Sequence, residues 1–301
     1  MPAFGKLGDL LARLRRPAEA TDELKLLAGT ALSHAVAARR GYASLAELEF
    51  RVFSQFGDDG ILQYLAAKLA LPHRTFVEFG VEDYSESNTR FLLQKDNWSG
   101  FVMDGSEACI ERLRRATYFW KHELEAKAAF VTRENIGALL REHTGHWPGI
   151  DLLHIDLDGN DYWVWRAIDL QPAIVIVEYN SVFGSERAIT IPYAADFRRA
   201  QAHYSRLYWG ASLKALVQLA RTKGYAFIGC NSAGNNAYFV RRDAMNAAVA
   251  EVPLELGYVR SKFREARDRS GALSYLSGAA RAEAIRGLPV FDLEQDRVVP
   301  F

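Results

Sequence analysis

Several features that mark specialised proteins are scarce in this sequence of 301 residues. It has only two cysteines, Cys109 and Cys230, which lie far apart and in no Cys-x-x-Cys pattern, so it predicts neither a disulfide framework nor a structural zinc site. The 37 basic and 37 acidic residues cancel, which removes any overall attraction to nucleic acid or an anionic membrane. No apolar run approaches the roughly 20 residues that cross a bilayer. Two free thiols and the lack of a signal-peptide core favour a cytoplasmic protein.

Apolar residues nevertheless make up 49% of the chain, enough for a real core, and the patterning divides it into three parts. Residues 1–50 form a helical N-terminal extension, whose basic, amphipathic start favours a helix that docks on the domain or lies weakly on a membrane surface. Residues 51–242 form an α/β domain. Within it, 181–210 is too long for an ordinary loop and is a predicted substrate lid. Residues 243–301 form a charged tail that we predict to be mostly helical.

From Thr75 onward, short apolar runs of strand length alternate with helical stretches. The runs are TFVEFG, GFVMDGS, KAAFVT, DLLHIDLD, AIVIVEYN, YAFIGCN and NAYFVRR. The first five are separated by segments long enough for crossover helices, which indicates a parallel sheet with helices on both faces. The last two are joined by a Ser-Ala-Gly-Asn turn and should form an antiparallel hairpin. We therefore predict an α/β fold with a mostly parallel seven-stranded sheet and a C-terminal antiparallel hairpin.

The carboxyl ends of the predicted parallel strands are acidic. The residues are Glu78, Glu82, Asp83, Asp104, Asp156, Asp158 and Glu178. Ligands of open α/β sheets bind at this edge, and a pyrophosphate would be repelled there. The turn after the first strand also lacks a glycine-rich cradle, because Gly80 is followed by Glu82 and Ser85 where further glycines would stand. NAD, FAD and ATP are therefore poor candidates, and a cationic ligand without phosphate, such as S-adenosylmethionine, suits the site better.

Two acids have the positions that such a ligand needs. Glu78, in the first strand, can hold the ligand's ammonium group directly or through water. Asp104 lies about two dozen residues after Gly80, which is the spacing of an acid that accepts hydrogen bonds from both ribose hydroxyls.

Five motifs, SQFGDDG, FVEFGVEDYSESNTRFL, GFVMDGS, DLLHIDLDGNDYWVW and IVIVEYNSVFG, resemble those of FkbM-type S-adenosylmethionine methyltransferases over roughly residues 53–241. The resemblance implies a Rossmann-like class I methyltransferase fold, cofactor roles for Glu78, Gly80 and Asp104, and a place for Asp156 facing the transferred methyl group. The full predicted cofactor-binding set is Glu78, Gly80, Glu82, Asp104, Ser106 and Asp156. The sequence departs from the general pattern at Glu82, where a second glycine is expected.

A second group of residues ends two strands that should be neighbours, and its oxygen ligands suit Mg²⁺ or a similar ion. The predicted metal set is Asp156, Asp158, Glu178 and Asn180. Some O-methyltransferases use a divalent ion to hold and acidify a substrate hydroxyl. In the alternative interpretation, Asp158 and the Gly-Asn-Asp that follows cap the next helix, and Glu178 is held by hydrogen bonds.

An alcohol acceptor needs a general base, and the candidates are Asp156 and His203. His203 stands among lid aromatics that can stack on a sugar ring, but a lone histidine is also often an ordinary hydrogen-bonded residue. Asn235 and Asn236 flank a glycine turn, where asparagine is expected on conformational grounds, although amides also suit sugar hydroxyls. The predicted substrate contacts are Tyr204, Tyr208, Trp209, Asn180, Asn235 and Asn236. His154, inside the fourth strand, is predicted to be structural.

Two functions remain open at this stage. The resemblance implies a methyltransferase that transfers a methyl group in line to an oxygen of a saccharide or natural product, with a small-molecule or glycan acceptor and no nucleic acid. The alternative is a catalytically inactive relative that keeps the fold and acts as a binding or scaffolding protein, which Glu82 and the basic N-terminal helix favour.

Overall fold

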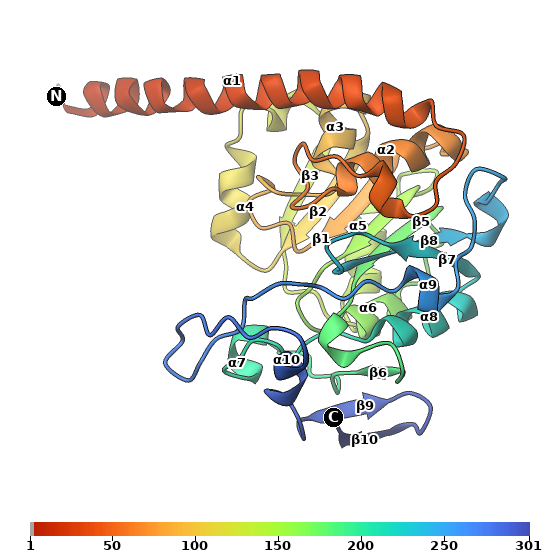
Figure 1. Ribbon diagram of the computed structural model, residues 1–301. Coiled ribbons are helices and arrows are strands. Elements are labelled where there is room, and N and C mark those ends of the chain that lie inside the picture. The colour runs from red at the N-terminus through yellow and green to blue at the C-terminus, as the bar shows by residue number, and fades with distance from the viewer. Residues whose placement is uncertain (1–2) are drawn as a thin grey trace.

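A seven-stranded sheet forms the centre of the protein in the computed structural model, which describes the backbone of residues 3–301 and the side chains from residue 20 on (Figure 1). Its strands are β1 Thr75–Phe79, β2 Ser99–Asp104, β3 Leu124–Ala128, β4 Leu152–Ile155, β5 Ile174–Glu178, β7 Tyr225–Cys230 and β8 Asn236–Arg241. Their order is β3-β2-β1-β4-β5-β8-β7, in which β1 to β5 are parallel and β8 is antiparallel to both of its neighbours. This is the Rossmann-like class I methyltransferase fold, so the predicted fold class and the C-terminal hairpin are confirmed.

Helices cover both faces of the sheet, because alternate strand residues send their side chains to opposite sides. In β1, Phe76 packs in the apolar layer with Ile61 and Ile110, whereas Val77 packs in the other layer with Leu140 and Val164. The first layer lies under α2 Asp58–Lys68, α3 Arg90–Asp96 and α4 Glu107–Arg114, and the second under α5 Ile136–Thr144, α6 Asp161–Ala167 and α8 Leu213–Thr222. Each such side chain contributes about 1.5–3 kcal/mol on burial, which fixes the register of the strands and hence the edge at which they end.

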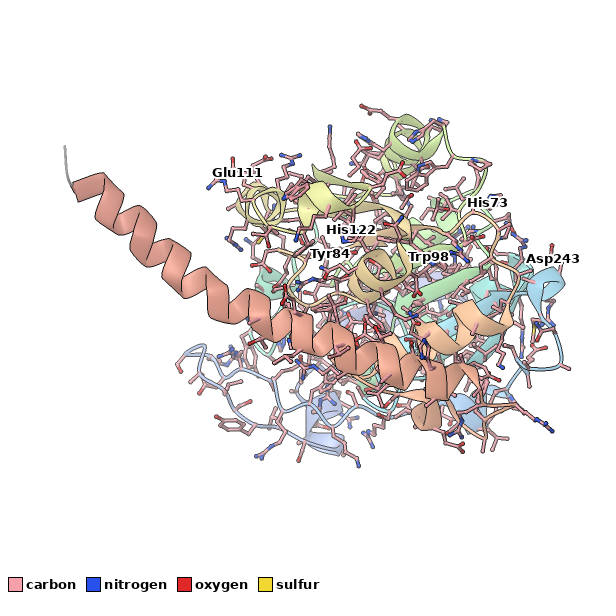
Figure 2. The ribbon with its side chains drawn as sticks, turned by 90° about the horizontal axis from the view of Figure 1, so that it is seen from above. His73, Tyr84, Trp98, Glu111, His122 and Asp243 are labelled. Atoms are coloured by element: carbon pink, nitrogen blue, oxygen red, sulfur yellow. The ribbon has the colours of Figure 1, made fainter. Side chains whose placement is uncertain are left out.

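The predicted N-terminal extension is helical. The long helix α1 Ala3–Ala37 crosses the helices of one face, and its N-terminal part extends beyond the body of the domain (Figures 1 and 2). Leu26, Gly29 and Ser33 lie on the side of α1 that faces the body, and Gly29 sits against Val52 and Phe91. The side chains that would decide the predicted membrane-surface contact, those of residues 1–19, lie outside the described part. Of the helices in residues 3–301, none is at once long enough and apolar enough to cross a membrane.

The C-terminal part differs from the mostly helical tail that the sequence predicts. It contains the short helices α9 Leu254–Gly257 and α10 Ala279–Glu283, followed by a hairpin of β9 Pro289–Asp292 and β10 Arg297–Pro300. Strand β9 also pairs with β6 Ile189–Thr190 of the lid, so lid and tail share a three-stranded sheet. The charges misled the prediction, because two short apolar runs, Pro289–Phe291 and Val298–Pro300, flank the polar turn Leu293–Asp296, which is a hairpin pattern.

Short helices connect the larger elements. They are η1 Leu45–Leu48, η2 Phe119–Lys121, η3 Ser181–Phe183, α7 Arg199–Ala202 and η4 Arg242–Ala244. Of these, η3 and α7 belong to the lid, and α7 brings a basic side chain to the cavity described next.

Candidate active site

A cavity of about 750 Å³ lies at the carboxyl ends of the parallel strands. Its walls include residues from or just after β1, β2, β4 and β5, among them Gly80, Asp104, Asp156 and Glu178. The lid contributes Phe197, Arg199 and Trp209, and the C-terminal part contributes Phe263, Arg264 and Glu265. The fold therefore gathers residues from almost the whole domain at the edge where ligands of such sheets bind.

Gly80 lets the turns after β1 and β4 touch. Its φ is 73°, in the left-handed region that favours glycine, and a Cβ there would lie 1.7 Å from the Asp156 carbonyl oxygen. Any side chain at this position would push the Asp156 backbone away. The single glycine of the turn thus allows the ends of β1 and β4 to lie in contact beside the cavity.

Asp104 ties the turn after β1 to the start of α4. Its Oδ2 accepts a hydrogen bond from the Glu82 backbone N–H at 2.8 Å, and its Oδ1 accepts one from the Ser106 N–H at 2.7 Å. Ser106 in turn caps α4 by accepting from the Cys109 N–H at 3.3 Å. Each carboxylate oxygen of Asp104 keeps a further lone pair, so the side chain is fixed in place and still able to bind a ligand.

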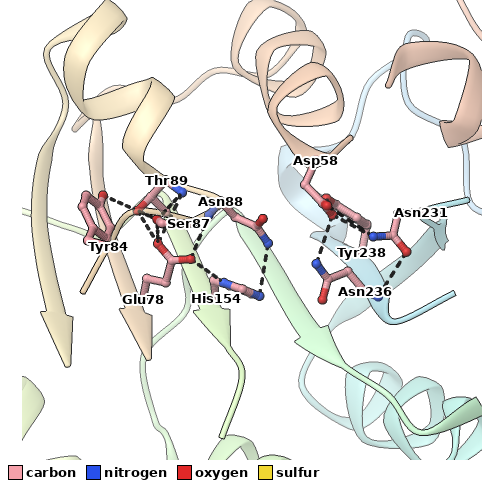
Figure 3. Close-up of polar contacts among 10 residues, drawn as sticks. All are labelled: Asp58, Glu78, Tyr84, Ser87, Asn88, Thr89, His154, Asn231, Asn236 and Tyr238. Atoms are coloured by element: carbon pink, nitrogen blue, oxygen red, sulfur yellow. Dashed lines mark hydrogen bonds and ion pairs between the residues drawn. The ribbon is translucent and has the colours of Figure 1, made fainter. Parts of the chain in front are cut away.

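Glu78 is fully engaged with protein groups (Figure 3). Its Oε2 accepts from the hydroxyls of Ser87 at 2.6 Å and Thr89 at 2.5 Å, and its Oε1 accepts from the Asn88 N–H at 3.0 Å. The same Oε1 lies 2.9 Å from His154 Nδ1. This carboxylate therefore holds the loop before α3 against the floor of the cavity.

The Glu78–His154 contact is a buried ion pair. Burial by itself would raise the pKa of Glu78, but hydrogen bonds and charge from His154, helped by Ser87 and Thr89, outweigh it and hold the pKa below its usual value. Burial would likewise lower the pKa of His154, and the Glu78 carboxylate outweighs that and raises it. The two side chains are only 3% and 5% exposed, so each neutralises a charge that water cannot reach.

A second polar cluster lines the cavity beside the first (Figure 3). Asp58, at the start of α2, accepts from Tyr238 Oη at 2.5 Å, from Asn236 Nδ2 at 3.0 Å and from Asn231 Nδ2 at 3.1 Å. Asn231 Oδ1 also accepts from three N–H groups of its own turn, those of Gly234, Asn235 and Asn236. The asparagines of the β7–β8 turn thus shape the turn, as expected of this residue type, and Asn235 and Asn236 line the cavity as well.

Three carboxylates, Asp156, Asp158 and Glu178, meet at the floor, and one oxygen of each lies within 4.8 Å of the others. Burial, with the charge of Asp158, raises the pKa of Asp156 to about 7. Burial, with the charge of Asp156, raises the pKa of Glu178 well above its usual value. Two carboxyl groups this close cannot both ionise easily, so Asp156 and Glu178 form an acid pair that holds a proton near neutral pH.

Arg199, in the lid segment 181–210, binds the acidic floor of the cavity. Its guanidinium lies 2.6 Å from Asp158 Oδ1 and 2.8 Å from Glu265 Oε2, and 4.6 Å from the ring centroid of Trp209. One side chain thus joins the turn after β4, the lid and the C-terminal part.

The structure brings together most of the residues predicted from the sequence. Those that line the cavity are Glu78, Gly80, Glu82, Asp104, Ser106, Asp156, Asp158, Glu178, Trp209, Asn235 and Asn236. The others have different surroundings. Asn180 Nδ2 donates to the carbonyls of Leu207 and Trp209 and its Oδ1 accepts from Val182 N–H, so its amide folds the lid rather than facing a ligand.

Three predicted lid residues lie away from the cavity walls. His203 Nδ1 lies 2.8 Å from Ser205 Oγ, and its ring packs on Tyr204 with centroids 4.3 Å apart. Tyr208 is buried in a separate apolar cluster, where its hydroxyl donates to the Pro289 carbonyl. Of the aromatic and histidine residues predicted in this segment, Trp209 alone lines the cavity.

Sequence reasoning missed several wall residues. They are Asp58, Asn88, His154, Arg199, Phe263, Arg264 and Glu265. Asp58 stands in the SQFGDDG motif, where the pair of aspartates at the start of a helix could have indicated a functional residue. Arg199 and Phe263 carry no such signal, because their place in the cavity depends on how lid and tail fold back.

Four polar atoms of wall residues are buried without a hydrogen-bond partner in the described part of the chain. They are Asn160 Oδ1, Glu178 Oε2, Asn236 Oδ1 and Trp209 Nε1. Buried polar groups are normally paired, so unpaired ones in a cavity mark positions where a ligand or an ordered water makes the bond. Three of the four are oxygens, so the cavity suits a ligand rich in donors.

No protein-family model matches the chain, and no curated protein matches its sequence. Solved structures that resemble it include S-adenosylmethionine-dependent methyltransferases. The enzyme from Clostridium acetobutylicum ATCC 824 is 9% identical with a TM-score of 0.37, over 61% of this chain and 89% of that one. An O-methyltransferase family protein from Burkholderia thailandensis is 11% identical with a TM-score of 0.36, over 74% and 58%. The N-terminal domain of EvdMO1 with SAH bound is 12% identical with a TM-score of 0.36, over 55% and 72%. These similarities are low, so the function proposed below rests on the cavity.

Proposed function

We propose that the protein is an S-adenosylmethionine-dependent methyltransferase that acts on a hydroxyl of a saccharide or natural product. One observation carries the proposal: a cavity at the carboxyl edge of a class I methyltransferase sheet has a fixed aspartate, Asp104, on one wall and a proton-holding acid pair, Asp156 and Glu178, at its floor. The first feature suits a ribose, and the second suits removal of a proton from an alcohol.

The wall residues fit S-adenosylmethionine, which supplies an electrophilic methyl group when bound. Asp104 accepts from the ribose hydroxyls, while the turn Gly80–Glu82 and Ser106 lie beside it. Glu78 receives a different role from the one predicted. Because His154 already neutralises it and both of its oxygens accept from protein donors, we assign it to positioning the loop before α3. The negative charge near the ammonium group then comes from Glu82, at the cavity wall.

Asp156 is the proposed general base. The Asp156 carboxylate takes the proton of the acceptor hydroxyl, whose oxygen would then accept the methyl group that bound S-adenosylmethionine would supply. A pKa of about 7 suits this role, because the carboxylate is partly ionised at neutral pH and still basic enough to take a proton. Glu178, protonated, orients its neighbour. His203, the other candidate base, hydrogen-bonds with Ser205 outside the cavity walls.

We also propose that a divalent cation such as Mg²⁺ binds here, with Asp156, Asp158 and Glu178 as its ligands. Asn180, the fourth predicted ligand, is left out, because its amide atoms are all engaged in the lid. Arg199 already contacts Asp158, so an ion would share or replace that contact.

We further propose a small-molecule or glycan acceptor rather than nucleic acid, since the 37 basic and 37 acidic residues give no net attraction to a polyanion. Cys109 and Cys230 are both free, which agrees with the proposed cytoplasmic location.

Calorimetry with S-adenosylhomocysteine tests the proposal. We expect wild-type protein to bind it, and Asp104→Ala to weaken binding at least tenfold, since hydrogen bonds to a charged group contribute on the order of 1.5–3 kcal/mol. Asp243→Ala, an exposed aspartate outside the cavity, is the matched control and should bind like wild type. Titration with and without Mg²⁺ tests the proposed metal. If the affinity for S-adenosylhomocysteine and the methyl-transfer rate are the same in chelator, the protein does not use a divalent cation.

Unchanged affinity in Asp104→Ala would overturn the cofactor assignment. Binding of S-adenosylhomocysteine with no methyl transfer to any hydroxyl acceptor in a broad screen would favour the alternative of an inactive, scaffolding relative.

A further inference from the structure

A second cavity of about 360 Å³ adjoins the active-site cavity. The two share three wall residues, Gln55, Phe56 and Phe263. The rings of Phe56 and Phe263 stack with centroids 5.1 Å apart and planes at 17°, so an aromatic pair stands at the doorway between the two spaces.

One side of the doorway is an extended segment, residues 259–265, anchored by its inward side chains. Ser261 Oγ lies 2.7 Å from Ser181 Oγ, and the Ser261 carbonyl accepts from Arg281 Nη1 at 2.9 Å. Alternate residues of an extended chain point to opposite sides. With Ser261 buried, the side chains of Arg260, Lys262 and Arg264 are exposed on the other side.

These cations lack the partners that surface cations usually have. In the part of the chain that the structure describes, Lys262 has no hydrogen bond or ion pair, and it lines the second cavity. Arg264 lines the first cavity and donates from Nε to the Tyr275 carbonyl at 3.1 Å, with no carboxylate against it in that same part.

The opposite wall adds a third cation. Arg51 lines the second cavity and pairs with Glu86 at 2.9 Å, but both side chains are more than half exposed, at 59% and 53%, and such pairs contribute little. The acid of this wall, Glu49, accepts hydrogen bonds from the Ser232 N–H and hydroxyl and is held against that turn. The doorway thus carries three basic side chains, those of Arg51, Lys262 and Arg264, beside the carboxylates of Glu49 and Glu86, whereas the floor of the first cavity holds acids alone.

We propose that this doorway binds a phosphate group of the acceptor through Lys262, Arg264 and Arg51, while the hydroxyl to be methylated lies inside, near Asp156. The inference rests on the proposed function and names the class of its acceptor, a phosphorylated sugar or similar phosphate ester. Arginine and lysine are the side chains that recognise phosphate, and exposed cations beside an acidic pocket orient a molecule that has a phosphate at one end and a neutral hydroxyl at the other.

The test is calorimetry of the full chain at low ionic strength, with glucose 1-phosphate, inorganic pyrophosphate, glucuronate and glucose as probes. We expect the two phosphate probes to bind at least tenfold more tightly than glucose. We expect Lys262→Gln/Arg264→Gln to lose at least tenfold of that affinity. Arg40→Gln is the matched control, because Arg40 is also an exposed cation but lines neither cavity.

S-adenosylhomocysteine is titrated into the same variants and into Lys262→Gln alone, which separates the two proposals. The single variant Lys262→Gln, whose side chain lines only the second cavity, should keep wild-type affinity for it while binding the phosphate probes more weakly. Absence of S-adenosylhomocysteine binding with intact phosphate binding would count against the proposed function alone. The phosphate site is overturned if the double variant binds glucose 1-phosphate like wild type, if neither phosphate probe binds the wild type, or if glucose or glucuronate binds as tightly as glucose 1-phosphate.

Discussion

At the scale of single residues, two carboxyl groups in the same cavity, those of the buried Glu78 and the half-buried Asp156, have opposite electrostatic surroundings. Glu78 faces His154 and several donors, and its pKa stays below the usual value. Asp156 faces other acids, and its pKa rises to about 7. Neighbouring groups of the same type with pKa values pushed apart are a sign of divided roles, which agrees with the proposed positioning role of Glu78 and the proposed proton transfer by Asp156.

Replacing Asp156 by asparagine should remove activity and preserve the fold. We expect the transfer rate to fall at least 100-fold, the usual order for a general base, with little change in melting temperature because no buried ion pair is broken. In wild type the rate should rise with pH up to about 7, as Asp156 ionises. Methyl transfer measured across pH checks both, with Asp243→Asn as control; full activity in Asp156→Asn would exclude it as the base.

Replacing Glu78 by glutamine should mainly cost stability. The change leaves His154 buried without its counter-charge, so we expect the free energy of unfolding to fall by about 3 kcal/mol in urea denaturation at pH 7. The exposed Glu255→Gln should have no measurable effect. Adding His154→Gln to Glu78→Gln should cost little more, since the pair is already broken. Equal stabilities of wild type and Glu78→Gln would contradict the ion pair.

At the scale of elements, two kinds of contact hold the lid: an apolar cluster that it shares with the C-terminal part, and the ion pairs of Arg199 in the short helix α7. Helix α7 has four residues, none of them buried, and Arg199 at its start joins Asp158 to Glu265. The sequence predicted a lid over 181–210, and the residues of it that line the cavity are Phe197 and Arg199, just before and in α7, and Trp209. The hairpin β9–β10, which the sequence did not predict, contacts the lid because β9 pairs with the lid strand β6.

Replacing Arg199 by glutamine should loosen the lid without unfolding the domain. We expect backbone hydrogen exchange over residues 194–209 to speed up by roughly tenfold or more, because this segment loses its ion pairs to Asp158 and Glu265, while β1 to β5 keep their protection. Arg221→Gln, an exposed arginine of α8, is the matched control. Unchanged exchange in the lid of Arg199→Gln would show that other contacts hold it.

At the scale of the whole molecule, buried acids make stability depend on pH. Burial raises the pKa of Asp59 to about 6 and that of Asp161 to about 6, and Asp156 is raised to about 7. The same groups in the unfolded chain ionise near pH 4. Between these values the folded protein binds more protons than the unfolded one, so stability falls as the pH rises.

We therefore expect the free energy of unfolding to be larger at pH 5 than at pH 8, by on the order of 5 kcal/mol, given about 1.4 kcal/mol for each pKa unit by which these groups lie above pH 5. Urea denaturation at a series of pH values measures it. Asp156→Asn should flatten the upper part of the curve. A stability that stays level or rises over this range would show that these acids are not buried as described.

The sequence by itself determined the sheet, because apolar runs of strand length at crossover spacing leave few other ways to bury them, and it placed Gly80, Asp104, Asp156 and Glu178 at the ends of those strands. It also predicted the antiparallel end of the sheet from one short turn. Only the tertiary structure decided which side chains remain available to bind a ligand in the cavity. Glu78 and Asn180 are satisfied by protein groups, while Arg199 and Phe263 come from segments without a local pattern. The local sequence pattern determines helices, strands and turns, because these are stabilised by contacts within a few residues. The partners of a carboxylate and the position of a lid depend instead on chain segments that can lie more than 100 residues apart, such as those of Asp58 and Asn236.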